Sequence, residues 1–156
     1  MCVIIDASVA GLVFAIPSRP EYAPVWQWIE EKDGVIVYGG QLAQELGKVR
    51  EGARRLRSLS QAGKAHRVSP ANLEREEATV RGLGARLGLR RLRKFNDRHV
   101  IALARLSGAR VLCTDDGDLQ DRFRNTGLVP RPKGRIYKRA EHKHLLHHDG
   151  NCPRNA

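Results

Sequence analysis

The sequence predicts an α/β fold in which helices cover both faces of a parallel sheet. Three short apolar runs rich in β-branched residues, at 2–5, 34–38 and 109–114, have the length and composition of buried strands. The segments between these runs place their apolar residues at helical spacing. Strands that alternate with helices are joined by crossover connections, so we expect them to run parallel.

The first half of the chain is expected to alternate strands with amphipathic helices. Ser8 follows the first strand and is available as a helix N-cap. In a later helix Val25, Trp28 and Ile29 fall on one side, which suits either a core or a dimer interface. The elements expected here are a strand over 2–5, helices over 8–15 and 23–32, a strand over 34–38 and one long helix over 41–62.

The second half continues the alternation. Asn96 is expected to cap a helix that Gly108 ends. The expected elements are a short strand over 66–69, helices over 70–87 and 96–108, a strand over 109–114, a short helix within 118–123 and extended pieces near 128–138. We expect one folded domain over 1–135, followed by a polar, histidine-rich extension over 136–156.

The net charge of +11 is concentrated in the middle of the chain. Residues 45–96 carry fourteen Lys and Arg against five Asp and Glu, whereas residues 1–44 carry two against five. Clustered basic side chains favour a phosphate-bearing partner such as nucleic acid, and a solvated helix surface is the alternative. The side chains expected to bind nucleic acid are Arg50, Arg54, Arg91, Arg93 and Lys94.

Membrane and secretory classes are not favoured. No apolar run approaches the ~18 residues of a membrane span, and the N-terminus lacks the basic start of a signal peptide. Three widely spaced cysteines are more typical of a reducing cytosol than of a disulfide framework. We therefore expect a cytoplasmic protein.

Acidic residues follow the expected strands at several places. Asp6 ends the first strand, Glu45 lies early in the helix after the second, and Asp97 opens a later helix. Asp116 and Asp118 follow the third strand. Ligand sites of open parallel sheets lie beyond the carboxyl ends of the strands, so these acids are expected to converge. Converging carboxylates repel one another, and a hard divalent ion such as Mg²⁺ relieves that cost.

Each acid also has a structural interpretation. Asp6 could cap the following turn, Glu45 could be a solvated helix residue, and Asp97 could favour a helix N-terminus electrostatically. The run from Asp115 to Asp121 could form a solvated turn in which one acid caps a helix. The order and placement of the acids together favour the metal site.

The chain resembles the PIN domain family, which includes the VapC-like toxin ribonucleases. The resemblance rests on "VIIDASV" at 3–9, "GGQLAQEL" at 39–46 and "NDRHVIALARLSGARVLCTDDGDL" at 96–119. It covers roughly residues 1–123, and the third block is the most specific. The resemblance implies a three-layer α/β/α sandwich with a central parallel sheet and an acidic pocket that binds Mg²⁺ or Mn²⁺.

The resemblance also implies roles for individual residues. Asp6, Glu45, Asp97 and Asp116 match the four catalytic acids of the family, and Asp118 matches a further acid. The metal ligands are expected to be Asp6, Asp97, Asp116 and Asp118, supported through hydrogen bonds by Ser8 and Thr114. Asp115 and Asp121 are left as solvent-facing or capping residues.

The function expected from these observations is metal-dependent hydrolysis of RNA phosphodiester bonds. The metal would activate a water and stabilise charge on the scissile phosphate. The family resemblance also raises a toxin role with a cognate antitoxin, and related domains often form homodimers. A non-catalytic nucleic-acid-binding or assembly module is the alternative. A haloacid-dehalogenase-type phosphate enzyme ranks last, because Ser8 stands where that class has a second Asp.

The C-terminal stretch contains His142, His144, His147, His148 and Cys152. Imidazole and thiolate are ligands that zinc prefers, but the spacing matches no standard structural zinc pattern. We expect a flexible, partly basic tail, with a zinc site as the lesser alternative.

Overall fold

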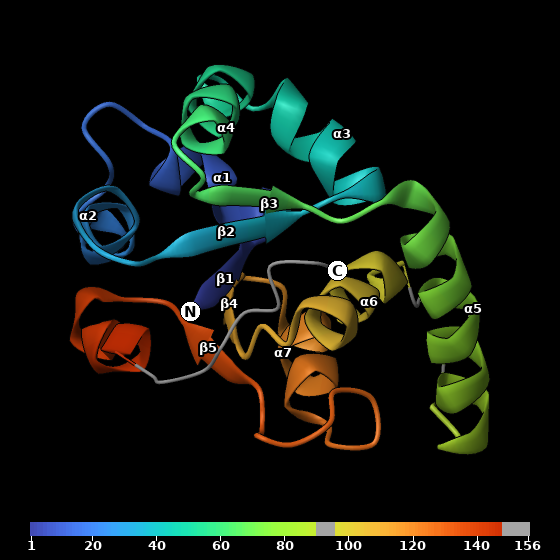
Figure 1. The fold of residues 1–156 in the computed structure, drawn as a ribbon. Coiled ribbons are helices and arrows are strands. Elements are labelled where there is room, and N and C mark those ends of the chain that lie inside the picture. Colours follow the sequence, from blue (N-terminus) through green and yellow to red (C-terminus); the bar gives the residue numbers. More distant parts are fainter. Residues whose placement is uncertain (90–95, 148–156) are drawn as a thin grey trace.

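The computed structural model describes residues 1–89 and 96–147 and contains a five-stranded sheet in which all strands run parallel (Figure 1). The strand order is β3-β2-β1-β4-β5. The strands are β1 (Cys2–Ile5), β2 (Val35–Tyr38), β3 (Ala65–Arg67), β4 (Val111–Cys113) and β5 (Arg135–Tyr137). The parallel sheet predicted from the apolar runs is confirmed.

Helices lie on both faces of the sheet, which makes the fold a three-layer α/β/α sandwich. In Figure 1, α1, α3 and α4 lie on one side of the sheet, and α6 and α7 lie on the other. The helices are α1 (Ala7–Val13), α2 (Ala23–Glu31), α3 (Gly40–Lys48), α4 (Gly52–Gln61), α5 (Pro70–Arg86), α6 (Arg98–Ser107), α7 (Gly117–Arg124) and the 3₁₀ helix η2 (Ala140–His147).

The strand order creates a switch point between β1 and β4. The chain adds β2 and β3 on one side of β1, and then returns to add β4 and β5 on the other. Ile5 of β1 pairs with Cys113 of β4. Consequently Asp6 and Thr114, the next residues of the two strands, leave the sheet side by side at the edge where such folds bind ligands.

The long helix expected over 41–62 is instead two helices. α3 ends at Lys48 and α4 begins at Gly52, with Glu51 between them at a left-handed φ of 64°. A Cβ on Gly52 would lie 2.2 Å from the carbonyl oxygen of Leu46, so only glycine permits this close approach. The break changes the direction of the chain and lets each helix bury its own leucines.

Two expected helix caps also differ from the structure. The N-cap of α1 is Asp6, whose carboxylate accepts a hydrogen bond from the Ser8 backbone, so Ser8 is not the cap. The N-cap position of α6 is Asp97 rather than Asn96. In both cases the aspartate immediately precedes the first helical residue. Ser8 instead donates its hydroxyl to Asp6, and the backbone carbonyl of Asn96 contacts the His99 ring. Gly108 ends α6 with a φ of 74°, as expected.

The folded part of the chain extends past the expected boundary at residue 135. That boundary falls inside β5, where the ring of Tyr137 is fully buried. Leu145 and Leu146 of η2 are also buried. These apolar side chains lie among histidines and lysines, which is why the segment has a polar composition although it packs against the core.

The apolar face of α2 belongs to the core. Val25 and Ile29 are fully buried and Trp28 is nearly so, which leaves no dimer interface at these three side chains. Cys113 is a buried free thiol. Among the described residues, no helix combines the length and apolar character needed to cross a membrane.

Replacing Gly52 with alanine is expected to destabilise the protein by about 1–3 kcal/mol, because the new methyl group collides with the Leu46 carbonyl. Gly47→Ala is the matched control, since a Cβ there meets no atom within 4 Å and alanine is the better helix former. Urea unfolding of both variants measures the difference. Equal stabilities would contradict the role assigned to the α3–α4 junction.

Candidate functional site

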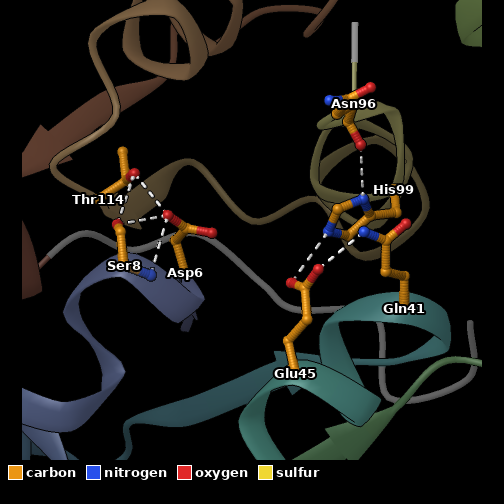
Figure 2. Close-up of polar contacts among 7 residues, drawn as sticks. All are labelled: Asp6, Ser8, Gln41, Glu45, Asn96, His99 and Thr114. Atoms are coloured by element: carbon orange, nitrogen blue, oxygen red, sulfur yellow. Dashed lines mark hydrogen bonds and ion pairs between the residues drawn. The ribbon is translucent and has the colours of Figure 1, made fainter. Parts of the chain in front are cut away.

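The site begins with a hydrogen-bonded group where β1 and β4 end. Thr114 Oγ1 donates to Asp6 Oδ2 at 2.8 Å, and Ser8 Oγ donates to the same oxygen at 2.5 Å. The backbone N–H of Ser8 reaches this oxygen at 3.4 Å. Figure 2 shows the three side chains drawn together around one carboxylate oxygen. Oδ1 of Asp6 makes no hydrogen bond to the described residues, so it is available to a ligand.

Thr114 also fixes the acidic loop that follows β4. Its buried Oγ1 accepts a hydrogen bond from the backbone N–H of Asp116 at 3.1 Å. The Thr114 carbonyl accepts from the Gln120 side chain at 3.2 Å, and Ser8 Oγ accepts from the backbone N–H of Asp115 at 3.2 Å. The supporting roles expected of Ser8 and Thr114 therefore have a geometric basis.

Asp116 is the N-cap of α7. Its Oδ1 accepts a hydrogen bond from the backbone N–H of Leu119 at 2.9 Å. The capping residue expected at Asp115 or Asp121 is thus Asp116, because the cap must immediately precede the first helical residue. Asp115, Asp118 and Asp121 are exposed. The second oxygen of Asp116 has no hydrogen bond to the described residues.

Asp97 lies at the start of α6, half-buried beside the other acids. Burial raises the pKa of its carboxyl, and the charges of Asp116 and Asp6 raise it further. The Arg122 guanidinium, which donates to Asp97 Oδ2 at 3.1 Å, and His99 offset part of this effect. Asp97 is therefore close enough to two other acids to be repelled by them, although it comes from a different segment.

Glu45 lies on α3 and contacts α6. Gln41, one turn earlier, donates to Glu45 Oε1 at 2.7 Å. His99 Nε2 lies 3.7 Å from Glu45 Oε2, and Nδ1 of the same ring contacts the Asn96 carbonyl at 3.1 Å. In Figure 2 this group lies apart from the Asp6 group, with the Glu45 carboxylate turned toward α6.

Asp6, Asp97 and Asp116 lie near one another at one end of the sheet and Glu45 lies apart from Asp6, so the four predicted catalytic acids do not form a closed metal cage. Among residues 1–89 and 96–147, no three His, Cys, Asp or Glu side chains are close enough to form a metal-binding group. The donor set still suits a hard divalent ion that retains several waters, because Asp6 and Asp116 each present an unengaged carboxylate oxygen. Mg²⁺ and Mn²⁺ have this preference.

Cys113 does not supply a nucleophilic thiol at this site. Cys113 immediately precedes Thr114, but its side chain is fully buried. Burial raises the pKa of the Cys113 thiol, which keeps it protonated and a poor nucleophile. The chemistry of the site therefore rests on its oxygen-bearing side chains.

The predicted nucleic-acid-binding residues divide into two groups. Arg50 and Arg54 are exposed, and Arg54 pairs with Glu51 at 2.5 Å. Arg91, Arg93 and Lys94 lie outside the described residues. Arg55, in the same basic stretch, has a structural role: its guanidinium lies 3.9 Å from the centre of the Trp26 ring.

The histidines of the C-terminal segment pack locally. His142 accepts a hydrogen bond from the backbone N–H of Lys138 and packs edge-on against the Tyr137 ring. His148 and Cys152 lie outside the described residues. The zinc alternative stays a prediction.

Three side chains of the site were not predicted from sequence: Gln41, His99 and Arg122. Gln41 precedes Glu45 by four residues, a spacing that brings side chains together on a helix and could have indicated the contact. His99 is a buried polar residue among the mostly apolar buried residues of α6. Nothing in the sequence singles out Arg122 among the other arginines.

No protein-family model, curated protein or solved structure matches this chain.

Thr114→Val is expected to destabilise the protein by about 1–3 kcal/mol, because it leaves the Asp116 N–H without its acceptor and removes a donor to Asp6. Thr79→Val is the control, since Thr79 is exposed on α5 and its loss should change stability by less than about 0.5 kcal/mol. Urea unfolding compares the two. A Thr114→Val protein as stable as the control would exclude Thr114 as the anchor of this edge.

Asp97→Asn is expected to stabilise the metal-free protein at pH 7. A carboxyl whose pKa is raised by folding costs stability once it ionises, and this loss develops as pH rises through the unfolded-state pKa of about 3.9 toward the raised value. The gain from Asp97→Asn should therefore shrink as pH falls from 7 to 4. The amide oxygen of the introduced asparagine could still accept the hydrogen bond from Arg122.

Urea unfolding in EDTA at a series of pH values tests this expectation. Asp121→Asn serves as the control, because Asp121 is exposed on the same helix that carries Arg122. A stability difference for Asp97→Asn that has the opposite sign, or that is the same at every pH, would contradict the repulsion inferred at Asp97.

Proposed function

We propose that this protein is a metal-dependent endoribonuclease with a PIN-like site. The observation that carries the proposal is the convergence of Asp6, Asp97 and Asp116 at the switch point of a parallel sheet. These acids come from three separate segments, and the charges of Asp6 and Asp116 contribute to the raised pKa of Asp97. A divalent cation bound among these carboxylates would relieve their repulsion and could act in catalysis.

Asp6, Asp97, Asp116 and Asp118 would hold the metal, and Glu45 would orient a water at the same edge. A bound Mg²⁺ or Mn²⁺ supplies Lewis-acid stabilisation of the scissile phosphate and a more acidic water. Arg122 would have to share Asp97 with the cation, because it already donates to Oδ2. Thr114 and Ser8 keep Asp6 in one orientation by occupying Oδ2.

RNA is the proposed substrate because it brings a chain of phosphates to a strongly basic protein. The net charge is +11. Arg50, which follows α3, and Arg54, which lies on α4, are both exposed basic residues. Counterion release from such contacts makes binding favourable and sensitive to salt. An antitoxin that silences the enzyme, and a homodimer, belong to the same proposal through the family resemblance.

A non-catalytic nucleic-acid-binding module is the second candidate, and one observation favours it. Each of the four predicted catalytic acids already has a partner within the protein: Asp6 and Asp116 cap helices, Asp97 pairs with Arg122, and Glu45 accepts from Gln41. The acids could thus be retained for stability alone. The two candidates differ in whether the acids are needed for RNA cleavage.

Cleavage of a mixed RNA pool in Mg²⁺ or Mn²⁺ is expected for the wild type, and EDTA should abolish it. The Asp6→Asn, Asp97→Asn double variant should lose more than about 100-fold of the rate, because two of the four charges that would hold the metal are removed. Asp121→Asn should cleave like the wild type.

The alternative outcome is equally informative. Salt-sensitive RNA binding by a wild type that shows no cleavage, unchanged in the double variant, would favour the non-catalytic module. Cleavage that persists in EDTA or in the double variant would exclude the proposed site.

A further inference from the structure

A pocket of about 400 Å³ lies where α3 and α4 cover the ends of β2 and β3 (Figure 1). This volume falls in the range of about 300–1,000 Å³ that is typical of ligand sites. None of the predicted catalytic acids lines the pocket, and no Asp or Glu is among the described residues that do. Its polar lining residues are Tyr38, Gln44, Arg57, Ser60, Gln61 and Arg67.

Two arginines line this pocket without an acidic partner. Arg57 comes from α4 and Arg67 from the last position of β3, and both are exposed. Their side chains make no hydrogen bond or ion pair to residues 1–89 or 96–147, whereas Arg54, one turn earlier on α4, pairs with Glu51. Two cations at one pocket repel each other, and a bound anion relieves that repulsion. Phosphate is an anion that the planar guanidinium group fits well.

Tyr38 adds an aromatic side chain beside these charges. It is the residue of β2 that pairs with Arg67 of β3, so the two side chains project from the same face of the sheet. Tyr38 is half-buried, and its hydroxyl makes no hydrogen bond to the described residues. An aromatic ring next to basic side chains is the usual combination for binding single-stranded nucleic acid, because the ring stacks on a base while the cations hold the backbone.

The pocket lies at the same end of the sheet as the acidic residues. The register of β1 against β2, continued by two residues, places Tyr38 level with Ile5, the last residue of β1. Arg67 is one strand further on, so about 10 Å separates it from β1. α3 contributes to both places, because Glu45 on it faces α6 and Gln44 lines the pocket. A single strand of RNA that crosses α3 can therefore reach the pocket and the acids together.

We propose that this pocket is a subsite for single-stranded RNA, in which Arg57 and Arg67 bind a backbone phosphate and Tyr38 stacks on an adjacent base. The subsite holds a nucleotide at a distance from the bond that is cleaved. This inference rests on the proposed function, because RNA is the ligand in both.

Binding of a fluorescein-labelled single-stranded RNA to the full-length protein in EDTA tests the subsite, with fluorescence anisotropy as the readout. The Arg57→Gln, Arg67→Gln double variant should bind at least about 10-fold more weakly at low salt, because it loses charge-assisted hydrogen bonds to phosphate. The slope of log K against log[salt] should also become shallower, by about 0.7 for each phosphate contact that is lost.

The matched control is the Arg124→Gln, Lys133→Gln double variant, which removes the same charge from the opposite end of the sheet. Arg124 is the last residue of α7, Lys133 comes two residues before β5 begins, and both are exposed. This variant should bind RNA nearly as tightly as the wild type. Equal losses in the two double variants would show that only the overall charge matters, and would overturn the subsite.

Two substitutions of Tyr38 test the stacking contact. Tyr38→Leu removes the ring and should weaken binding of single-stranded RNA by about 5-fold or more, whereas Tyr38→Phe should bind like the wild type. Duplex RNA of the same sequence should bind equally to all three proteins, because its bases are already stacked on one another. A Tyr38→Leu protein that keeps its affinity for single-stranded RNA, or that loses both RNAs alike, would contradict the stacking role.

The outcomes separate the two levels of the proposal. A wild type that cleaves RNA, with an Arg57→Gln, Arg67→Gln variant that binds RNA equally well, would overturn the subsite and leave the proposed function intact. A wild type that binds RNA through these arginines but does not cleave it in Mg²⁺ or Mn²⁺ would overturn the nuclease and leave the subsite. A wild type that neither binds nor cleaves RNA would overturn both.

Discussion

The hydrogen bond from Thr114 to Asp6 is the interaction on which the rest of the site depends. It joins the ends of β1 and β4, the neighbouring strands that form the switch point of the sheet. Because Thr114 is fully buried, its hydroxyl cannot exchange this bond for one to water. The same hydroxyl receives the N–H of Asp116, so one side chain sets the relative position of two acids that are far apart in the sequence.

A second constraint is the electrostatic repulsion among Asp6, Asp97 and Asp116. A hydrogen-bond or ion-pair partner stabilises the charge of each of these three carboxylates. Hydroxyls surround one oxygen of Asp6, a helix N–H binds one oxygen of Asp116, and Arg122 pairs with Asp97. Helix N-termini stabilise negative charge, so placing Asp6 and Asp116 at N-caps lowers the cost of bringing them together. The fold can therefore form without a bound cation.

The sequence could predict the strands and the acids because both depend on local patterns. Apolar β-branched runs indicated β1, β2 and β4, and the residues that follow them could be placed at one edge once the strands were taken as parallel. The break at Gly52 could not be predicted, since it depends on a carbonyl that approaches within 2.2 Å of where a Cβ would lie. The pairing of Arg122 with Asp97 and of His99 with Glu45 depends on how α6 packs against α7 and α3, which no local pattern encodes. Similarly, Leu145 and Leu146 are too few among polar neighbours to indicate burial.

Structural and catalytic roles of the same acid need not compete, because a carboxylate has two oxygens. Asp6 uses Oδ2 for its cap and its hydroxyl partners and leaves Oδ1 without a bond to the described residues, and Asp116 uses Oδ1 and leaves Oδ2. Asparagine caps helices about as well as aspartate, so an Asp→Asn substitution keeps the capping bond while removing the charge. Loss of cleavage in an Asn variant that remains as stable as the wild type would therefore report on the charge itself. Alanine could not make this distinction, because it would remove the cap and the proposed metal ligand together.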